Sequence, residues 1–180
     1  MLTILAGTNR PGSSTRKVVR HLEGVYHGLG RPFVVVDLLE LPADAFTSAS
    51  YAQKPAALQP FIDKMLASTA LVVVTPEYNG GFPGALKYFI DLLPFPASLQ
   101  RRPTAFVGVA AGEWGAMRPV EQLQALFGYR NAYLYPDRVF VRQCMKVFDA
   151  EGKIADADIV GRLAAQAAGF LAFADRQAGA

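Results

Sequence analysis

The sequence predicts an α/β fold, a doubly wound five-stranded parallel sheet with helices on both faces, in three layers. Short apolar runs alternate with amphipathic stretches along the chain of 180 residues. The apolar runs lack regular polar–apolar alternation, which is typical of strands buried on both faces. Strands that alternate with helices form parallel sheets covered on both sides. Because no linker, repeat or low-complexity segment interrupts this order, we expect residues 1–180 to form a single domain.

Three strands and two helices are expected in the first half of the chain. The strands are the apolar runs at residues 2–6, 33–36 and 71–75. A helix capped by Ser13 or Ser14 and ended by Gly30 joins the first two, because apolar side chains recur there with helical spacing. Residues 58–66 carry the same spacing before the third strand. The segment 39–54 is too long for a simple connection and predicts a lid or a partner contact.

The second half of the chain repeats the alternation and ends in a long helix. A helix between Pro83 and Pro94 has one proline in its first turn and the other at its end. The remaining elements are a strand at 104–110, a loop at 111–118, a helix at 120–127, a strand at 131–135 and a helix at 157–174. Residues 138–141 either extend the sheet or cross to its edge.

Composition and charge narrow the classes of function. The net charge of +3 favours anionic small molecules, but the basic residues are scattered, so no nucleic-acid partner is expected. Cys144 is the single cysteine, which excludes an intramolecular disulfide. Its apolar neighbours favour a buried structural thiol, and a reducing, cytoplasmic setting fits best. The N-terminus does not resemble a signal peptide and no apolar run approaches ~20 residues, so membrane insertion is not expected.

The loop at residues 7–15 follows the first strand and opens directly into a helix. Ligands of such folds bind at the carboxyl ends of the strands, and a helix N-terminus favours an anion. The loop supplies two glycines, a guanidinium and four hydroxyls, on Gly7, Gly12, Arg10, Thr8, Ser13, Ser14 and Thr15. These groups predict a phosphate site. The alternative is an ordinary strand-to-helix turn capped by serine.

Two common nucleotide loops do not fit. Gly7 and Gly12 have the spacing of a Walker loop, but Ser13 stands where its lysine should be. The pair Gly28 and Gly30 lacks the third glycine of a dinucleotide fingerprint and follows a helix rather than a strand. A dinucleotide held in the Rossmann manner is therefore disfavoured.

The loop at 75–84 is suited to a flat ligand. Gly80 and Gly81 permit positive φ and leave bare backbone amides. Asn79 can bond the edge of a heterocycle, while Tyr78 and Phe82 can wall a planar ring. The alternative is a Pro/Gly turn with buried aromatic side chains.

The loop at 111–118 has glycines at Gly112 and Gly115 that allow close approach of the backbone. Trp114 can cover a ligand or pack on a neighbouring helix or subunit, and Arg118 is a candidate contact for a second substrate. No catalytic triad and no cluster with metal-ligand spacing is present, and His21 and His27 are expected at the surface. We therefore assign no catalytic side chain and no metal site, and expect a cofactor to carry the chemistry.

The first two of these loops resemble the NADPH-dependent FMN reductase family of flavodoxin-like proteins. The family's first loop reads Gly-Ser/Thr-x-Arg-x-x-Ser-x-Asn/Thr, which Gly7 to Thr15 match. Its second reads Pro-Glu-Tyr-Asn followed by Pro-Gly-x-Leu-Lys, which Pro76 to Asn79 and then Pro83 to Lys87 match. The third loop departs, because Ala116 replaces a glycine before Arg118. The resemblance covers roughly residues 1–127.

The resemblance implies strand order 2-1-3-4-5, bound FMN, and a homodimer or homotetramer. By matched position, FMN would contact three groups of residues. Arg10, Ser13 and Thr15 would hold the phosphate. Pro76, Glu77, Tyr78 and Asn79 would lie along the ribityl chain and ring. Gly112 and Gly115 would approach the ring from the third loop.

The function expected is that of an NAD(P)H-dependent reductase, in which flavin passes hydride from NADPH or NADH to a quinone, a free flavin or a similar small acceptor. Arg118 is the candidate contact for the phosphates of the nicotinamide cofactor. Two alternatives stay open. One is a flavodoxin-type electron carrier, although such carriers are usually acidic. The other is a flavin- or phosphate-binding module without turnover.

Overall fold

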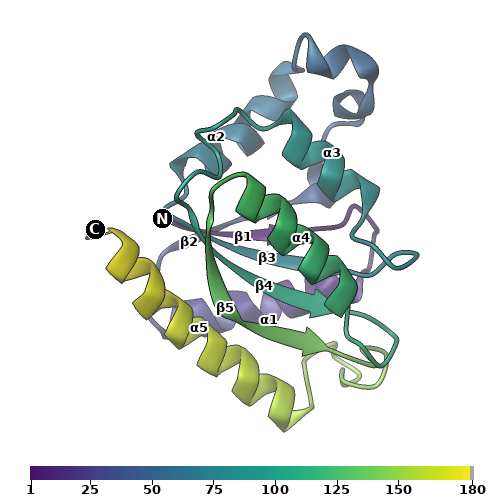
Figure 1. Ribbon diagram of the computed structural model, residues 1–180. Helices are drawn as coiled ribbons and strands as arrows, with labels where there is room; N and C mark the ends of the chain where they lie inside the picture. The colour runs from purple at the N-terminus through teal and green to yellow at the C-terminus, as the bar shows by residue number, and fades with distance from the viewer. Residues whose placement is uncertain (179–180) are drawn as a thin grey trace.

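A parallel sheet of five strands runs through residues 1–178, which are the residues that the computed structural model describes (Figure 1). Its strands are β1 (Leu2–Ala6), β2 (Phe33–Asp37), β3 (Ala70–Pro76), β4 (Pro103–Val109) and β5 (Tyr133–Val141). The spatial order β2-β1-β3-β4-β5 confirms the expected flavodoxin-like topology. The order reverses direction beside β1, so the carboxyl ends of β1, β3 and β4 lie side by side where a ligand is expected.

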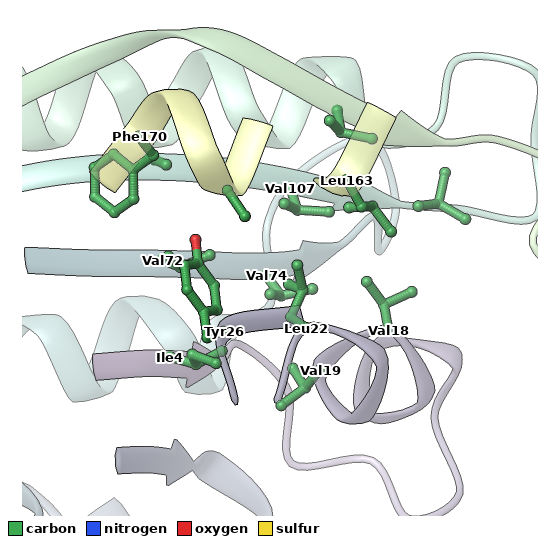
Figure 2. Packing of buried hydrophobic residues seen from close by; sticks show 14 of the residues in the cluster. Ile4, Val18, Val19, Leu22, Tyr26, Val72, Val74, Val107, Leu163 and Phe170 are labelled. Atoms are coloured by element: carbon green, nitrogen blue, oxygen red, sulfur yellow. The ribbon is translucent and has the colours of Figure 1, made fainter. Parts of the chain in front are cut away.

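Helices cover the two faces of the sheet. They are α1 (Ser14–Gly28), α2 (Gln59–Ala67), α3 (Gly84–Leu92), α4 (Met117–Tyr129) and α5 (Ala157–Ala178). Alternate strand residues face opposite cores. Ile4, Val72 and Val107 pack with α1 and α5, whereas Leu5, Val73 and Phe106 pack with α2, α3 and α4. Figure 2 shows Leu22 and Tyr26 of α1 on the first of these cores. Burial on both faces explains the unbroken apolar runs.

The fifth strand differs from its expected form. Residues 133–141 make one strand parallel to β4, so the strand begins two residues later than expected and residues 138–141 extend the sheet, the first of the two alternatives. Pro136 lacks a backbone donor, and the pairing shifts between Thr104 and Phe106 at this point. Gln166 of α5 donates to the carbonyls of Phe106 (3.0 Å) and Asp137 (2.9 Å), so the irregular ladder has its acceptors satisfied. The strand therefore continues past the proline and carries residues 141–145 to the ligand edge.

The long segment after β2 folds into short 3-10 turns. These are η1 (Leu38–Glu40), η2 (Ala43–Phe46), η3 (Ser48–Tyr51) and η4 (Ala56–Leu58). Tyr88 of α3 donates its hydroxyl to the Thr47 carbonyl at 2.6 Å, and its ring contacts those of Phe46 and Tyr51. The segment is thus fastened to α3, and its role as a lid or partner contact stays a prediction.

Two features of the helices depart from expectation. His21 is half-buried on α1 and its Nε2 is shielded from solvent, whereas His27 is exposed as expected. The helix α5 is long and apolar enough to cross a membrane by length and composition alone. Its apolar residues Leu163 and Phe170 are buried in the core between α5 and the sheet (Figure 2).

Candidate functional site

A cavity of about 320 Å³ lies at the carboxyl ends of β1, β3 and β4. The first loop, the second loop and the end of β4 all reach it, as the topology predicts. Its lining residues are Arg10, Pro11, Gly12, Ser13, Ser14, Thr15, Lys17, Pro76, Glu77, Tyr78, Val109, Ala110, Ala111, Cys144 and Met145. The cavity therefore brings together seven predicted cofactor residues: Arg10, Ser13, Ser14, Thr15, Pro76, Glu77 and Tyr78.

The first loop ends as a capped helix with one hydroxyl left over. Ser13 is the N-cap of α1, and its Oγ accepts from the backbone amide of Arg16 at 3.2 Å. Thr15 is 1% exposed, and its Oγ1 has no hydrogen-bond partner among residues 1–178. A buried hydroxyl without a partner is costly unless a ligand supplies one. The serine-capped turn is thus present. The buried, unpaired hydroxyl of Thr15 is an additional feature that such a turn alone does not need.

The second loop is a tight turn joined to the first loop. Tyr78 and Gly81 exchange two backbone hydrogen bonds, at 2.9 and 3.1 Å, around Asn79 (φ 53°) and Gly80 (φ 78°). An Asn-Gly pair suits these positive φ values. The Tyr78 hydroxyl lies 2.7 Å from Thr8 Oγ1, which also accepts from the Arg10 amide at 3.2 Å. This bond fixes the two loops relative to each other across the cavity.

The turn places Asn79 and Gly80 at its tip, outside the cavity lining. Thr8 is 2% exposed and likewise acts behind the lining, through its bond to Tyr78. Their direct contact with a cofactor stays a prediction.

The third loop lines the cavity through Ala111, and its predicted site residues lie beside the lining. Gly112 and Trp114 are exposed, the latter by 62%, so most of the Trp114 side chain is open to solvent. Gly115 is buried, and a Cβ there would lie 2.8 Å from the Cβ of Phe140. Ala116 adopts φ 68°, so the alanine that replaces the family's glycine still takes a left-handed conformation. The third loop thus makes its turn with an alanine at the position where the family pattern has a glycine.

Arg118 links the third loop to the second. Its Nη1 lies 3.7 Å from Oε1 of Glu77, and its side chain is 60% exposed. The glutamate lines the cavity while the arginine does not. Arg118 is therefore beside the cavity mouth, where a second substrate would approach.

Lys17, Cys144 and Met145 also line the cavity, although the sequence motifs do not mark them as site residues. Cys144 is buried, as expected for a structural thiol, but it also faces this cavity. Its backbone amide donates to the carbonyl of Ala110 at 2.9 Å, which ties the chain after β5 to the end of β4. A continuous fifth strand would have indicated this position, because the ends of parallel strands share one edge. Within residues 1–178 no group of three or more His, Cys, Asp or Glu side chains is placed to hold a metal ion.

The fold defines a flavodoxin-like protein with a cavity at the start of α1. More narrowly, the chain belongs to the NADPH-dependent FMN reductase family, whose model matches residues 1–146. It is 30% identical over 105 residues to an NAD(P)H-dependent FMN reductase of Pseudomonas aeruginosa, an alignment that spans 57% of each chain. It is 29% identical to a quinone reductase of Pseudomonas putida, over 86% of this chain and 84% of that one.

Solved structures agree with this fold. The flavoenzyme NAD(P)H:(acceptor) oxidoreductase FerB from Paracoccus denitrificans superposes with a TM-score of 0.82 at 21% identity, covering 98% of this chain and 97% of that one. A flavodoxin variant from Pseudomonas aeruginosa superposes with a TM-score of 0.57 at 17% identity, covering 97% of this chain and 96% of that one. At these identities the likeness concerns the fold.

Proposed function

We propose that this protein is an NAD(P)H-dependent, FMN-containing reductase that passes electrons to a quinone, a flavin or a similar small acceptor. The observation that carries the proposal is the buried, unpaired hydroxyl of Thr15 in a cavity formed by the two loops that match the family. The electron carrier and the non-catalytic module gain no support of their own from this cavity.

The residues of the first loop would hold the FMN phosphate. Thr15 Oγ1 and Ser13 Oγ are hydroxyl donors at the first turn of α1, where backbone amides and the helix dipole also favour an anion. The side chain of Arg10 is exposed at the rim and forms no ion pair with any residue in 1–178, so it is free to pair with a phosphate. Ser14 lines the cavity beside them.

The second loop would support the ribityl chain and the ring. Pro76, Glu77 and Tyr78 line the cavity next to the phosphate loop, and the Thr8–Tyr78 bond holds that wall in place. Asn79 and Gly80 would approach from the tip of the second loop. Gly112 and Gly115 would approach from the third loop, Gly115 through its backbone because it is buried. When bound, FMN accepts hydride from NADPH or NADH and passes the electrons on.

The mouth of the cavity would receive the nicotinamide cofactor and the acceptor in turn. Trp114 and Met145 are exposed by 62% and 76%, and Met145 lines the cavity. Large exposed apolar groups beside a flat cofactor suit planar substrates. Arg118 is the proposed contact for the phosphates of NADPH or NADH, since it is anchored by Glu77 and still open to solvent. The protein's part is to orient the reactants rather than to transfer protons.

The setting proposed for this activity is a single domain in the cytoplasm, assembled as a homodimer or homotetramer. A single cysteine fits a reducing compartment. Exposed aromatic side chains on α4 and just after α3 support assembly.

An absorbance spectrum of the purified protein tests the proposal. We expect flavin bands in the protein as isolated or after incubation with FMN, and loss of these bands when NADPH or NADH is added without oxygen. Addition of a quinone should restore them. A protein that gains no FMN, or whose FMN is not reduced by either nucleotide, would contradict the proposal. A stable one-electron intermediate in stepwise chemical reduction would instead favour the electron carrier.

A further inference from the structure

Lys17 is a cation in the candidate cofactor site that no part of the family pattern assigns. It lies in the first turns of α1 and lines the cavity together with Ser13, Ser14 and Thr15. From Ser14 to Lys17 is three positions, so the two side chains leave the helix on neighbouring faces. The lysine therefore stands beside the groups proposed to hold the phosphate.

A hairpin after β5 holds Lys17 in place. Residues 148–154 close through a bridge between Phe148 and Ile154, and the Asp149 amide donates to the Lys153 carbonyl at 2.9 Å. The Nζ of Lys17 lies 4.9 Å from the centroid of the Phe148 ring, a cation–π distance. Its stem passes over the turn, where a Cβ on Gly152 would be 3.6 Å from its Cε. This hairpin follows the last residue that the family model matches, 146.

The three cations of the first loop and the start of α1 differ in their partners. Arg16 is neutralised, because its Nε lies 3.1 Å from Oδ2 of Asp37 and its Nη1 bonds Glu23. Lys17 and Arg10 are in no ion pair with any residue that the structure describes. The cavity thus retains two positive charges that protein carboxylates do not offset.

Two nearby carboxylates have partners other than Lys17 and Arg10. Glu77 faces the cavity but is paired with Arg118 at 3.7 Å. Asp149 of the hairpin accepts from the backbone amide of Lys153 at 2.8 Å. A phosphate monoester carries about −1.5 to −2 charges at pH 7, which matches two cations and a helix N-terminus. The buried, unpaired Thr15 Oγ1 in the same wall indicates independently that a ligand oxygen belongs there.

We propose that Lys17, held by the hairpin at residues 148–154, is the second cation of the phosphate site and makes the protein select a flavin that carries a phosphate monoester over one that does not. The proposal rests on the proposed function, since it assumes that FMN occupies this cavity. It assigns a binding role to the chain beyond residue 146, because Phe148 positions the ammonium group.

Flavin fluorescence titrations of the full-length apoprotein test this role. In Lys17→Gln we expect the Kd for FMN to rise about tenfold, the range of one charged hydrogen bond in a partly exposed site. The Kd for riboflavin, which lacks the phosphate, should stay unchanged, so the preference for FMN over riboflavin falls by the same factor. The salt dependence of FMN binding should become shallower, because one cation fewer contacts the phosphate.

Two further variants complete the test. Phe148→Leu keeps the lysine but removes the ring beneath it, and should raise the Kd for FMN by a smaller factor, about threefold. Lys153→Gln removes the same charge from an exposed residue of the hairpin that does not line the cavity, and should leave both affinities unchanged. Circular dichroism of each variant shows that the fold is kept.

The outcomes separate this inference from the proposed function. If wild type binds FMN and Lys17→Gln binds it equally well, or loses FMN and riboflavin affinity alike, the role of Lys17 is overturned while the proposed function stands. An equal loss in Lys153→Gln would also overturn it, because general surface charge would then be the cause. If wild type binds no FMN at all, both proposals fail.

Discussion

At the scale of single residues, a change at Thr15 is expected to affect cofactor affinity without lowering the stability of the fold. The buried Oγ1 of Thr15 has no partner among residues 1–178, so replacing the hydroxyl with a methyl group removes a desolvation cost. We expect Thr15→Val to leave the apoprotein as stable as wild type, or more stable by up to about 1 kcal/mol. FMN affinity should fall about tenfold or more, because a hydrogen bond to a charged phosphate is lost.

Thr104→Val is the matched control for this prediction. Thr104 is also buried in the sheet, but its hydroxyl donates to the Arg102 carbonyl at 3.0 Å, far from the cavity. This variant should lose about 1 kcal/mol of stability and keep its FMN affinity. Urea unfolding measures the stability of both variants, and flavin titration measures their FMN affinity. A Thr15→Val apoprotein that is clearly destabilised would mean that the hydroxyl has a structural partner.

His21 makes a prediction about pH. Burial lowers its pKa from the usual 6.5, and its Nε2 has no partner in the described part of the chain. The unfolded chain therefore binds a proton more readily than the folded one, and stability falls as the pH drops below about 6.5. Between pH 7 and pH 5 the urea midpoint of His21→Gln should fall less than that of wild type. His27→Gln, on the exposed side of the same helix, should behave as wild type; equal pH profiles for all three would contradict this role.

At the scale of elements, the sequence predicts most of the fold because strands and helices here carry clear local signals. Buried strands such as β3 are unbroken apolar runs. The glycine-containing loop before α1 can be recognised from its composition. Pro136 is a local signal for the end of a strand, so the sequence leaves open whether residues 138–141 extend the sheet or cross to its edge. What continues the strand is distant in sequence, namely Gln166 bonding Phe106 and Asp137. The same long-range cause hid Cys144, which lines the cavity because β5 continues to Val141. Lys17 lines the cavity from α1, two positions beyond the loop motif.

The two predicted cofactor glycines of the third loop, Gly112 and Gly115, should differ in their effect on stability. A Cβ on Gly115 would lie 2.8 Å from the Cβ of Phe140, and the residue has φ 55°, so Gly115→Ala should cost at least about 2 kcal/mol of stability. Gly112 is exposed with nothing within 4 Å of its Cβ position, so Gly112→Ala should change stability by less than about 0.5 kcal/mol.

If Gly112 approaches the flavin ring, as the family match implies, its alanine variant should lose FMN affinity without losing stability. Thermal unfolding of the apoproteins and flavin titration of each variant check both glycines. A stable Gly115→Ala protein would contradict the close packing of this loop on β5. Unchanged FMN affinity in Gly112→Ala would remove this glycine from the cofactor site.

At the scale of the whole molecule, one surface away from the cavity mouth is suited to a second copy of the chain. Phe95, just after α3, and Tyr129, at the end of α4, are 70% and 81% exposed. They border a groove of about 440 Å³ between these helices, which Ile90 and Leu126 also line. Arg130 is almost buried beneath it, with its guanidinium carbon 5.0 Å from the centroid of the Phe95 ring. Aromatic and arginine side chains of this kind are enriched in interfaces between subunits.

The expected oligomer gives the last prediction. If the α3–α4 groove is the contact between copies, wild type should have a solution mass that is a multiple of 19.4 kDa, and Tyr129→Glu should reduce it, because two like charges would meet at a symmetric interface. Tyr51→Glu is the matched control. Tyr51 is 55% exposed, but it lies on η3 in the segment 39–54 and not at the groove. Light scattering during size-exclusion chromatography measures all three proteins. Dissociation by Tyr51→Glu alone would place the contact at the 39–54 segment, where a neighbouring subunit would then complete the site. A monomeric wild type would refute assembly altogether.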